Sequence, residues 1–109
     1  MSNGRERELA GVFAALGDAT RLTLVTRLLA AGALSATTLA EGQAISRQAI
    51  VKHLQVLEAA ALVVHERQGK EVLYALDASR IAEARAFLDA ISAGWDRALV
   101  RLKSLVETT

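Results

Sequence analysis

Hydrophobic residues recur every three or four positions through the first third of the chain, a spacing that predicts two amphipathic helices. The first stripe is formed by Leu9, Val12, Phe13 and Leu16, and Gly17 ends it. The second helix follows Asp18, whose carboxylate is suited to capping early backbone N–H groups. Its stripe is formed by Leu22, Val25, Leu28 and Leu29, and Gly32 marks its end.

Residues 35–60 have the pattern of a helix-turn-helix. Ser35 is a candidate N-cap of a short helix that runs through Leu39 and Ala40, and Gly42 interrupts that helix. Ser46 is the candidate cap of the next helix. One face of that helix carries Ile50, Leu54 and Leu57, and the other carries Arg47, Gln48, Val51, Lys52 and Gln55.

The polar face of the helix that begins at Ser46 suits the major groove of DNA, where base edges are recognised by Arg, Lys and Gln side chains. From residue 42 to residue 57 the only charged residues are Arg47 and Lys52. An ordinary surface helix often shows the same pattern. The DNA interpretation therefore depends on the elements that follow.

Two short segments rich in Val, Leu and Tyr predict a β-hairpin wing over residues 62–76. The strands are expected from Leu62 to Arg67 and from Lys70 to Leu76, with Gln68-Gly69 as the connecting turn. One face is expected to carry Leu62, Val64, Val72, Tyr74 and Leu76. Arg67 and Lys70 flank the turn, where a wing reaches phosphates or a minor groove, although charges are also common at solvated turns.

Residues 79–107 predict one long helix with a hydrophobic seam. The seam comprises Ile81, Ala84, Leu88, Ile91, Trp95, Ala98, Leu102 and Leu105. A core of this size is too small to bury so long a stripe, so we expect a homodimer interface, with packing of part of the stripe inside the chain as the alternative. The expected interface residues are Leu9, Val12, Phe13, Leu88, Ile91, Trp95, Leu99 and Leu102, with Trp95 as the anchor.

Composition narrows the class of protein. A chain of 109 residues with 52% hydrophobic residues predicts one domain, residues 1–109, mainly α with a small β-hairpin wing. The absence of Cys excludes disulfides, thiolate metal sites and thiol redox sensing. The start of the chain lacks the apolar run of a signal peptide, and no apolar run approaches the ~20 residues that cross a bilayer. We therefore expect a soluble, cytoplasmic protein without a membrane partner.

Neither histidine has the surroundings of a metal or catalytic site. His53, on the helix that begins at Ser46, is expected to donate to a phosphate or to support helix packing. His65 is expected to be a surface residue of the first hairpin strand. The sequence contains no recognisable nucleophile, phosphate loop or carboxylate constellation, so we expect no enzyme activity and no cofactor. Arg21, near the positive end of the second helix, is expected to bind a phosphate or a carboxylate.

Three segments together, GDATRLTLVTRLL, LSATTLAEGQAISRQAIVKHLQVLEAAALV and ERQGKEVLYAL, resemble the ArsR/SmtB family of dimeric winged-helix repressors. The resemblance covers about Leu9 to Leu105. RQAIVKHLQVLE and WDRALVRLKSLVE look like the branch of the family that lacks the usual metal ligands. The resemblance implies operator binding, with the helix from Ser46 to Ala60 as the reader and the terminal helix pairing two subunits. For Arg21 the resemblance favours a structural or backbone contact over a phosphate or carboxylate partner.

This chain departs from the family pattern at three places. It has no Cys, and neither His lies on the terminal helix, so metal sensing at the usual sites is not supported. Thr38 stands where the family often has the Glu of a capping box. Ala61 stands at the end of the reading helix, where the family usually has Gly, and a left-handed conformation there is unfavourable for Ala.

These observations predict a homodimeric, sequence-specific regulator, most simply a repressor, of a near-palindromic double-stranded operator. The expected DNA-binding residues are Ser46, Arg47, Gln48, Val51, Lys52, His53, Gln55, Arg67 and Lys70. The alternative is a winged-helix protein-interaction module, because Glu58, Glu66 and Glu71 dilute the basic footprint. The sequence leaves three modes of control open: a small-molecule effector between the terminal helices, a partner protein, and abundance alone.

Overall fold

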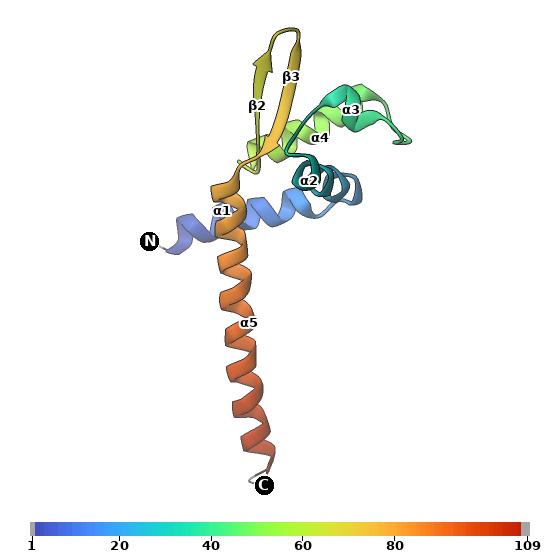
Figure 1. The fold of residues 1–109 in the computed structure, drawn as a ribbon. Coiled ribbons are helices and arrows are strands. Elements are labelled where there is room, and N and C mark those ends of the chain that lie inside the picture. Colours follow the sequence, from blue (N-terminus) through green and yellow to red (C-terminus); the bar gives the residue numbers. More distant parts are fainter. Residues whose placement is uncertain (1, 108–109) are drawn as a thin grey trace.

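A computed structural model describes residues 2–107 and confirms the predicted architecture, which is mainly α-helical with a β-hairpin wing (Figure 1). The elements in chain order are α1 (Ser2–Leu16), α2 (Ala19–Ala31), β1 (Ala33–Ser35), α3 (Ala36–Ala40), α4 (Arg47–Ala59), β2 (Val63–Gln68), β3 (Glu71–Leu76) and α5 (Ala78–Glu107).

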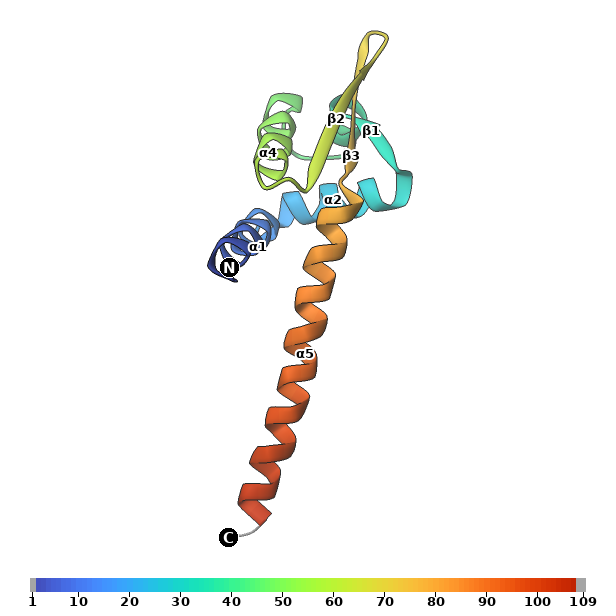
Figure 2. The same cartoon turned by 90° about the vertical axis from the view of Figure 1, so that its left-hand side faces the viewer.

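The molecule consists of a head and a long helical stem. Helices α1 to α4 and the sheet form the head, the β2–β3 hairpin protrudes from one end of it, and α5 extends away from the other (Figures 1 and 2). The principal extents are 68 × 33 × 20 Å. The hairpin and the free end of α5 therefore lie at opposite ends of the long axis.

The core of the head is built from apolar side chains of α1, α2, α3, α4 and β2. The largest fully buried side chains are Val12, Leu24, Leu28, Leu39, Ile50, Leu54, Leu57, Leu62 and Val63. The stripe predicted for α2 was partly wrong, because Leu24 is buried whereas Leu22 and Leu29 are exposed. The apolar arc of α2 is wider than the face that the core covers, and the sequence alone does not say which half is covered.

The sheet has three strands in the order β1-β3-β2, and β1 was missed by the sequence analysis. Strand β1 pairs antiparallel with β3, with Leu34 opposite Tyr74. A strand of three residues is too short to show an alternation of polar and apolar positions. It anchors the base of the hairpin to the chain segment that leads into α3.

The predicted hairpin turn was misplaced by one residue, which changes the partner of Arg67 from Lys70 to Val72. Gln68 pairs with Glu71, so the two-residue turn is Gly69-Lys70. Gly69 has a φ of 64°, which suits the first central position of a primed turn. The expected inner face of β2 was also wrong, because Val63 lies opposite Leu76 and shares its face, whereas Val64 lies opposite Ala75 on the other face. Val63 is therefore buried at 1% exposure, whereas Val64, expected on the inner face, is 48% exposed.

The three predicted N-caps are confirmed. The side chains of Asp18, Ser35 and Ser46 accept hydrogen bonds from the backbone N–H groups of Arg21, Thr38 and Ala49, at 3.0, 3.1 and 3.1 Å. Thr38 also accepts a hydrogen bond from the Ser35 hydroxyl at 3.1 Å. Each cap sets the residue at which its helix begins.

A further cap, at Asp77, begins the terminal helix. Its carboxylate accepts hydrogen bonds from the hydroxyl and the backbone N–H of Ser79 at 2.7 and 3.0 Å. The Ser79 hydroxyl is the main cause that lowers the pKa of Asp77 below its ordinary value. Asp77 also donates its backbone N–H to the carbonyl of Leu62, which ties the start of α5 to the start of β2.

Helix α4 ends in a Schellman motif with alanine at the left-handed position. The N–H of Leu62 donates to the carbonyl of Leu57 at 3.0 Å, and the N–H of Ala61 donates to that of Glu58 at 2.9 Å. Leu57 and Leu62 are both buried, which supplies the hydrophobic contact of the motif. Ala61 has a φ of 61°, so the unfavourable left-handed conformation anticipated from the sequence is present.

We expect Ala61→Gly to raise the free energy of unfolding by about 0.5–1 kcal/mol. Glycine removes the left-handed penalty of roughly 1–2 kcal/mol. Its greater conformational entropy in the unfolded chain offsets part of that gain. The neighbouring Ala60, with a φ of −86°, is the matched control, and Ala60→Gly is expected to lower stability. Urea denaturation at one fixed protein concentration measures both changes, and a loss of stability in both variants would contradict the assignment.

Candidate nucleic-acid interface

Helix α4 presents a polar face because its apolar face is held in the core. Ile50, Leu54 and Leu57 are fully buried, and this fixes the rotation of the helix about its axis. The expected reading residues Ser46, Arg47, Gln48, Lys52 and Gln55 are exposed on the other side. Val51 lies between the two faces, half-buried and packed against the core. The exposed face is therefore rich in hydrogen-bond donors with one apolar edge.

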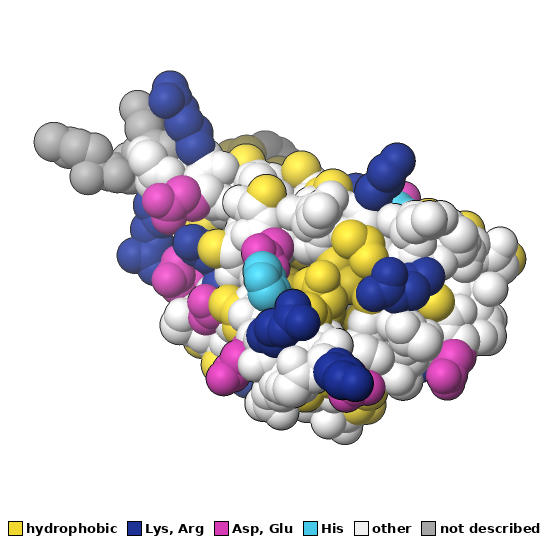
Figure 3. Space-filling view, turned by 90° about the horizontal axis from the view of Figure 1, so that it is seen from above, with side chains coloured by type: hydrophobic (Ala, Val, Ile, Leu, Met, Phe, Trp, Pro, Cys, Tyr) yellow, Lys and Arg dark blue, Asp and Glu magenta, His cyan; other side chains and the backbone are white. Residues whose placement is uncertain are grey.

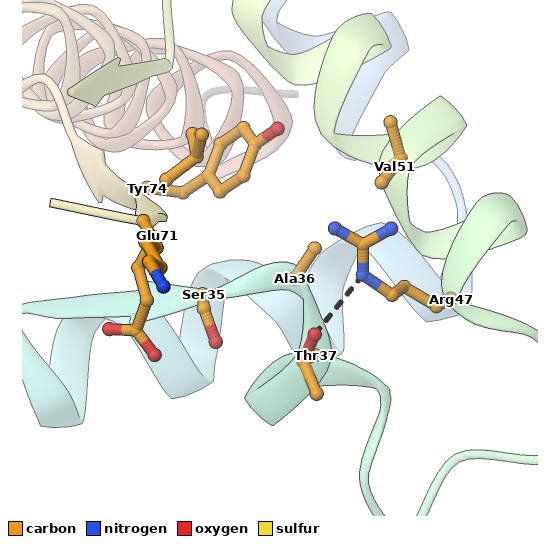
Figure 4. A pocket seen from close by; sticks show the side chains of 9 residues that line it. Ser35, Ala36, Thr37, Arg47, Val51, Glu71 and Tyr74 are labelled. Atoms are coloured by element: carbon orange, nitrogen blue, oxygen red, sulfur yellow. Dashed lines mark hydrogen bonds between the residues drawn. The ribbon is translucent and has the colours of Figure 1, made fainter. Parts of the chain in front are cut away.

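Arg47 is oriented by the helix that precedes it. Its Nε donates to Thr37 Oγ1 of α3 at 3.1 Å, and the end of its guanidinium group points into the space between α4 and Tyr74 (Figure 4). This space is a cavity of about 320 Å³ between α3, α4 and β3, and Val51 and Lys70 also line it. The hydrogen bond leaves both Nη atoms available to a group that enters from outside.

The hairpin places its two predicted cations beside the polar face of α4. Arg67 and Lys70 are both exposed, with Arg67 near the end of β2 and Lys70 in the turn itself. Seen from the hairpin end, Lys and Arg side chains surround a small apolar area, and most of the visible Asp and Glu side chains lie toward the edge of the view (Figure 3). This end of the molecule offers cations and polar donors around that apolar area.

The acidic residues near this surface reduce its positive charge less than their number suggests. Glu58 Oε1 contacts His65 Nδ1 at 2.6 Å, so one carboxylate is engaged by a histidine. Glu66 alternates with Arg67 along β2 and therefore projects from the opposite face of the strand. The Glu71 carboxylate points away from Arg47 (Figure 4).

The two histidines link elements of the head. His65 is an exposed strand residue, as expected, and its ring packs against Tyr74 with the centroids 5.8 Å apart. His53 has a side chain only 24% exposed, and its Nδ1 lies 3.2 Å from Arg21 Nη1 and 3.9 Å from Asp18 Oδ1. The Nδ1 atom, which the sequence analysis offered to a phosphate or to helix packing, is therefore turned toward α2.

Arg21 is engaged inside the protein. Its Nε donates to the backbone carbonyl of Ala15 in the last turn of α1, and its Nη1 contacts His53. The structural or backbone contact that the family resemblance favours for Arg21 is therefore present, and a backbone carbonyl and an imidazole stand where a phosphate or a carboxylate was the alternative. The backbone N–H of Arg21 is the main cause that lowers the pKa of Asp18 below its ordinary value.

Arg27 holds the other helix of the helix-turn-helix and was missed by the sequence analysis. Its Nη1 and Nη2 donate to the carbonyls of Leu39 and Thr38 at 2.6 and 3.1 Å. These carbonyls lie at the end of the short helix α3, where the Thr38 carbonyl also accepts the backbone N–H of Glu41 at 3.2 Å. The available signal was its position, since Arg27 lies between the buried Leu24 and Leu28 along α2.

Helix α5 packs on the head only near its start. Phe87 contacts Phe13 of α1 with the ring centroids 5.9 Å apart, and Arg80 Nη1 contacts Glu8 Oε2 at 3.3 Å. Beyond that point the expected interface residues Leu88, Ile91, Trp95, Leu99 and Leu102 are exposed, Trp95 at 63%. Leu9 and Val12, also expected at the interface, lie buried inside the protomer and offer no surface to a partner, whereas Phe13 is half-buried.

The described residues hold neither a metal-binding cluster nor a single helix that could span a membrane. Residues 2–107 contain no group of three His, Cys, Asp or Glu side chains that could hold a metal ion. Within the same residues no single helix is long and apolar enough to cross a membrane. The helical segments Gly4–Leu16 and Ala19–Ala31 are long and apolar enough only when taken together, and the chain bends by 98° between them.

Comparisons with known proteins agree on the type of fold. A family model described as a helix-turn-helix domain matches residues 16–66. The HTH-type transcriptional regulator Rv2034 of Mycobacterium tuberculosis is 38% identical over 94 residues, which are 86% of this chain and 84% of that protein. An ArsR-like transcriptional regulator from Rhodococcus sp. RHA1 superposes with a TM-score of 0.80 at 41% identity, covering 94% and 95% of the two chains.

A more distant likeness supports the fold alone. The Mycobacterium bovis protein Mb0332, a possible ArsR-family transcriptional regulator, has a solution structure of its homodimeric winged helix-turn-helix DNA-binding domain. It superposes with a TM-score of 0.68 at 22% identity, covering 84% of this chain and 83% of that one.

We expect Arg27→Met to lower the free energy of unfolding by about 1–2 kcal/mol, because it removes the guanidinium donors from the Leu39 and Thr38 carbonyls and leaves Thr38 with the Glu41 backbone N–H alone. Methionine preserves much of the apolar stem, so lost packing contributes little. Arg85→Met is the control, since Arg85 is exposed on α5 and makes only a 3.9 Å contact with Asp89. Denaturation curves in which the two variants lose equal stability would show that the hydrogen bonds from Arg27 to α3 contribute nothing.

Proposed function

We propose that this chain, which belongs to the ArsR-like family of winged helix-turn-helix, DNA-binding transcriptional regulators, represses transcription as a homodimer bound to an operator. The observation that carries the proposal is the pairing of two features at one end of the molecule. The exposed face of α4 offers Arg, Gln and Lys side chains, and the cation-bearing hairpin lies beside it.

The proposed DNA-binding residues divide by position into those that reach base edges in a groove and those that contact the DNA backbone. Gln48, Lys52 and Gln55 project from the exposed face of α4 and are placed to reach base edges in a major groove. Arg67 and Lys70 of the hairpin are placed to contact phosphates or an adjacent minor groove. Such a division gives α4 the sequence preference and the hairpin the salt-dependent part of the affinity.

Arg47 and Val51 occupy the boundary between these two groups. Arg47, held by Thr37, points into the cavity between α4 and the sheet, where a phosphate that passes between helix and hairpin would lie. Val51 lines the same cavity and offers an apolar edge to a thymine methyl group. The hydroxyl of Ser46 already serves as the cap of α4, so its contribution to DNA binding is indirect.

The exposed apolar face of α5 supports the homodimer. A helix of 30 residues is about 45 Å long, and most of this one has no packing partner within the protomer. An isolated helix gains little stability from backbone hydrogen bonds alone and depends on tertiary packing of its apolar face. A second copy of α5 has the matching apolar face, and Trp95 is the largest side chain available to fill the interface.

A two-fold dimer carries two copies of α4 and matches a near-palindromic operator. Half-sites read by such helices are separated by about one turn of DNA, roughly 34–36 Å. The protein acts by occupying this DNA and needs no catalytic step. Because the operator is genomic DNA, the site of action is the bacterial cytoplasm. The protein-interaction alternative is weakened by the engagement of Glu58 with His65.

We expect Lys52→Ala to weaken binding to the protein's own upstream DNA by about 1–3 kcal/mol and to reduce the preference over a scrambled duplex. Because the dimer carries two copies of Lys70, Lys70→Ala is expected to weaken both duplexes alike and to reduce the slope of log affinity against log salt by about 1.8, or about 0.9 for each subunit. Fluorescence anisotropy titrations over a series of salt concentrations measure both quantities.

Lys103→Ala is the control for these substitutions, since Lys103 is exposed on α5 beside Glu107 at the far end of the molecule. It should bind both duplexes as the wild type does. Wild-type affinity and wild-type salt slope in both Lys52→Ala and Lys70→Ala would remove DNA binding from this surface.

The prediction for the dimer compares two residues of α5 that are both exposed in the protomer. Leu102 and Val100 are 56% and 69% exposed, but they lie on opposite sides of α5, because two positions along a helix are about 200° apart. We expect Leu102→Asp to raise the dimer dissociation constant at least tenfold and Val100→Asp to change it little. Sedimentation velocity over a range of protein concentrations distinguishes them, and equal dissociation constants would contradict pairing through the seam.

A further inference from the structure

His53 belongs to the reading helix but has its Nδ1 turned inward. It lies next to the fully buried Leu54 along α4, and its side chain is only 24% exposed. Its Nδ1 lies 3.2 Å from Arg21 Nη1. A guanidinium group has donors and no acceptor, so Nδ1 must accept this hydrogen bond and the imidazole must be neutral with its proton on Nε2.

Arg21 extends this contact to a third element. Its Nε donates to the carbonyl of Ala15, in the last turn of α1. Carbonyls in the last turn of a helix have no helical partner, and an arginine side chain is well suited to them. One guanidinium group therefore joins the end of α1 to the middle of α4 through two hydrogen bonds.

We propose that the Arg21–His53 hydrogen bond is a positioning contact that holds the reading helix, and that protonation of His53 releases it. The proposal rests on the DNA-binding function proposed above. A proton on Nδ1 removes the acceptor of the Arg21 Nη1 hydrogen bond and places two cations side by side. Asp18 Oδ1, 3.9 Å from Nδ1, is the carboxylate to which the protonated ring turns.

The groups that face His53 favour this exchange of partners. Arg21 and Asp18 are the charged side chains against its ring, both from the start of α2. Asp18 is anchored as the N-cap of α2 and carries a lowered pKa, chiefly because it accepts the Arg21 backbone N–H, so it stays ionised when His53 takes up a proton. Movement of the imidazole from Arg21 toward Asp18 shifts the side chain of a residue on α4 itself.

The sign of the pH effect separates this role from direct contact with DNA. A histidine that contacts a phosphate gains a charge on acidification and strengthens binding. A histidine that accepts from Arg21 loses its contact on acidification, which displaces the reading helix and weakens binding. The two roles thus predict opposite changes in operator affinity over the same pH interval.

The test measures operator affinity of the full chain at about pH 8 and about pH 6, across the range in which histidines commonly titrate. We expect the wild type to lose affinity on the order of tenfold, the effect of one hydrogen bond to a charged group. His53→Asn keeps an acceptor near the Nδ1 position without titrating and should show no such loss. His65→Gln removes the other histidine of the chain and should retain it.

Stronger binding of the wild type at the lower pH, or an equal loss in the His53→Asn variant, would overturn the proposal. Sedimentation at both pH values verifies that the dimer persists. The hydrogen bond is also tested without DNA, by nitrogen NMR of the imidazole at the higher pH. Nδ1 unprotonated supports the contact, and a proton on Nδ1 overturns it, even if the protein shows no preference for its upstream DNA and the proposed function itself fails.

Discussion

The burial of one face of α4 is the constraint on which the rest of the structure depends. Ile50, Leu54 and Leu57 are fully buried, and α1, α2, α3 and β2 all pack against this helix. Burial of each such side chain contributes about 1.5–3 kcal/mol. The same burial fixes the rotation of α4, so the face that carries Gln48 and Lys52 points outward as a direct consequence of core packing.

Hydrophobic burial is not directional, and polar contacts supply the finer positions. Helix α2 provides two of them. Arg27 binds the carbonyls at the end of α3, and Arg21 joins the end of α1 to His53 on α4. Both helices of the helix-turn-helix are therefore held by guanidinium groups from one neighbouring helix. A protein that must place a helix within a groove of DNA benefits from such contacts, because misplacement weakens every base contact together.

The terminal helix poses the opposite problem, since its apolar face has nowhere to go within the protomer. Only its first turns pack on the head, through Phe87 and Arg80, and the seam from Leu88 to Leu102 stays exposed. The head is complete without this seam, so the stem is free to serve an interface. The exposed face of α4 and the seam lie at opposite ends of one chain, which allows pairing of two subunits without covering the surface that we propose for DNA (Figure 1).

The sequence by itself determined the kinds of element and most of their ends. Helical periodicity, the caps at Asp18, Ser35 and Ser46, and the glycine of the hairpin turn act over a few residues, so they are visible in the chain as written. Tertiary structure alone decided which half of the apolar arc of α2 is buried, the face of β2 that buries Val63 in place of Val64, and the strand β1. It also decided the partners of Arg21, Arg27 and His53, which lie 6 to 32 residues away along the chain. Those choices depend on contacts between segments distant in sequence, and no local pattern encodes them.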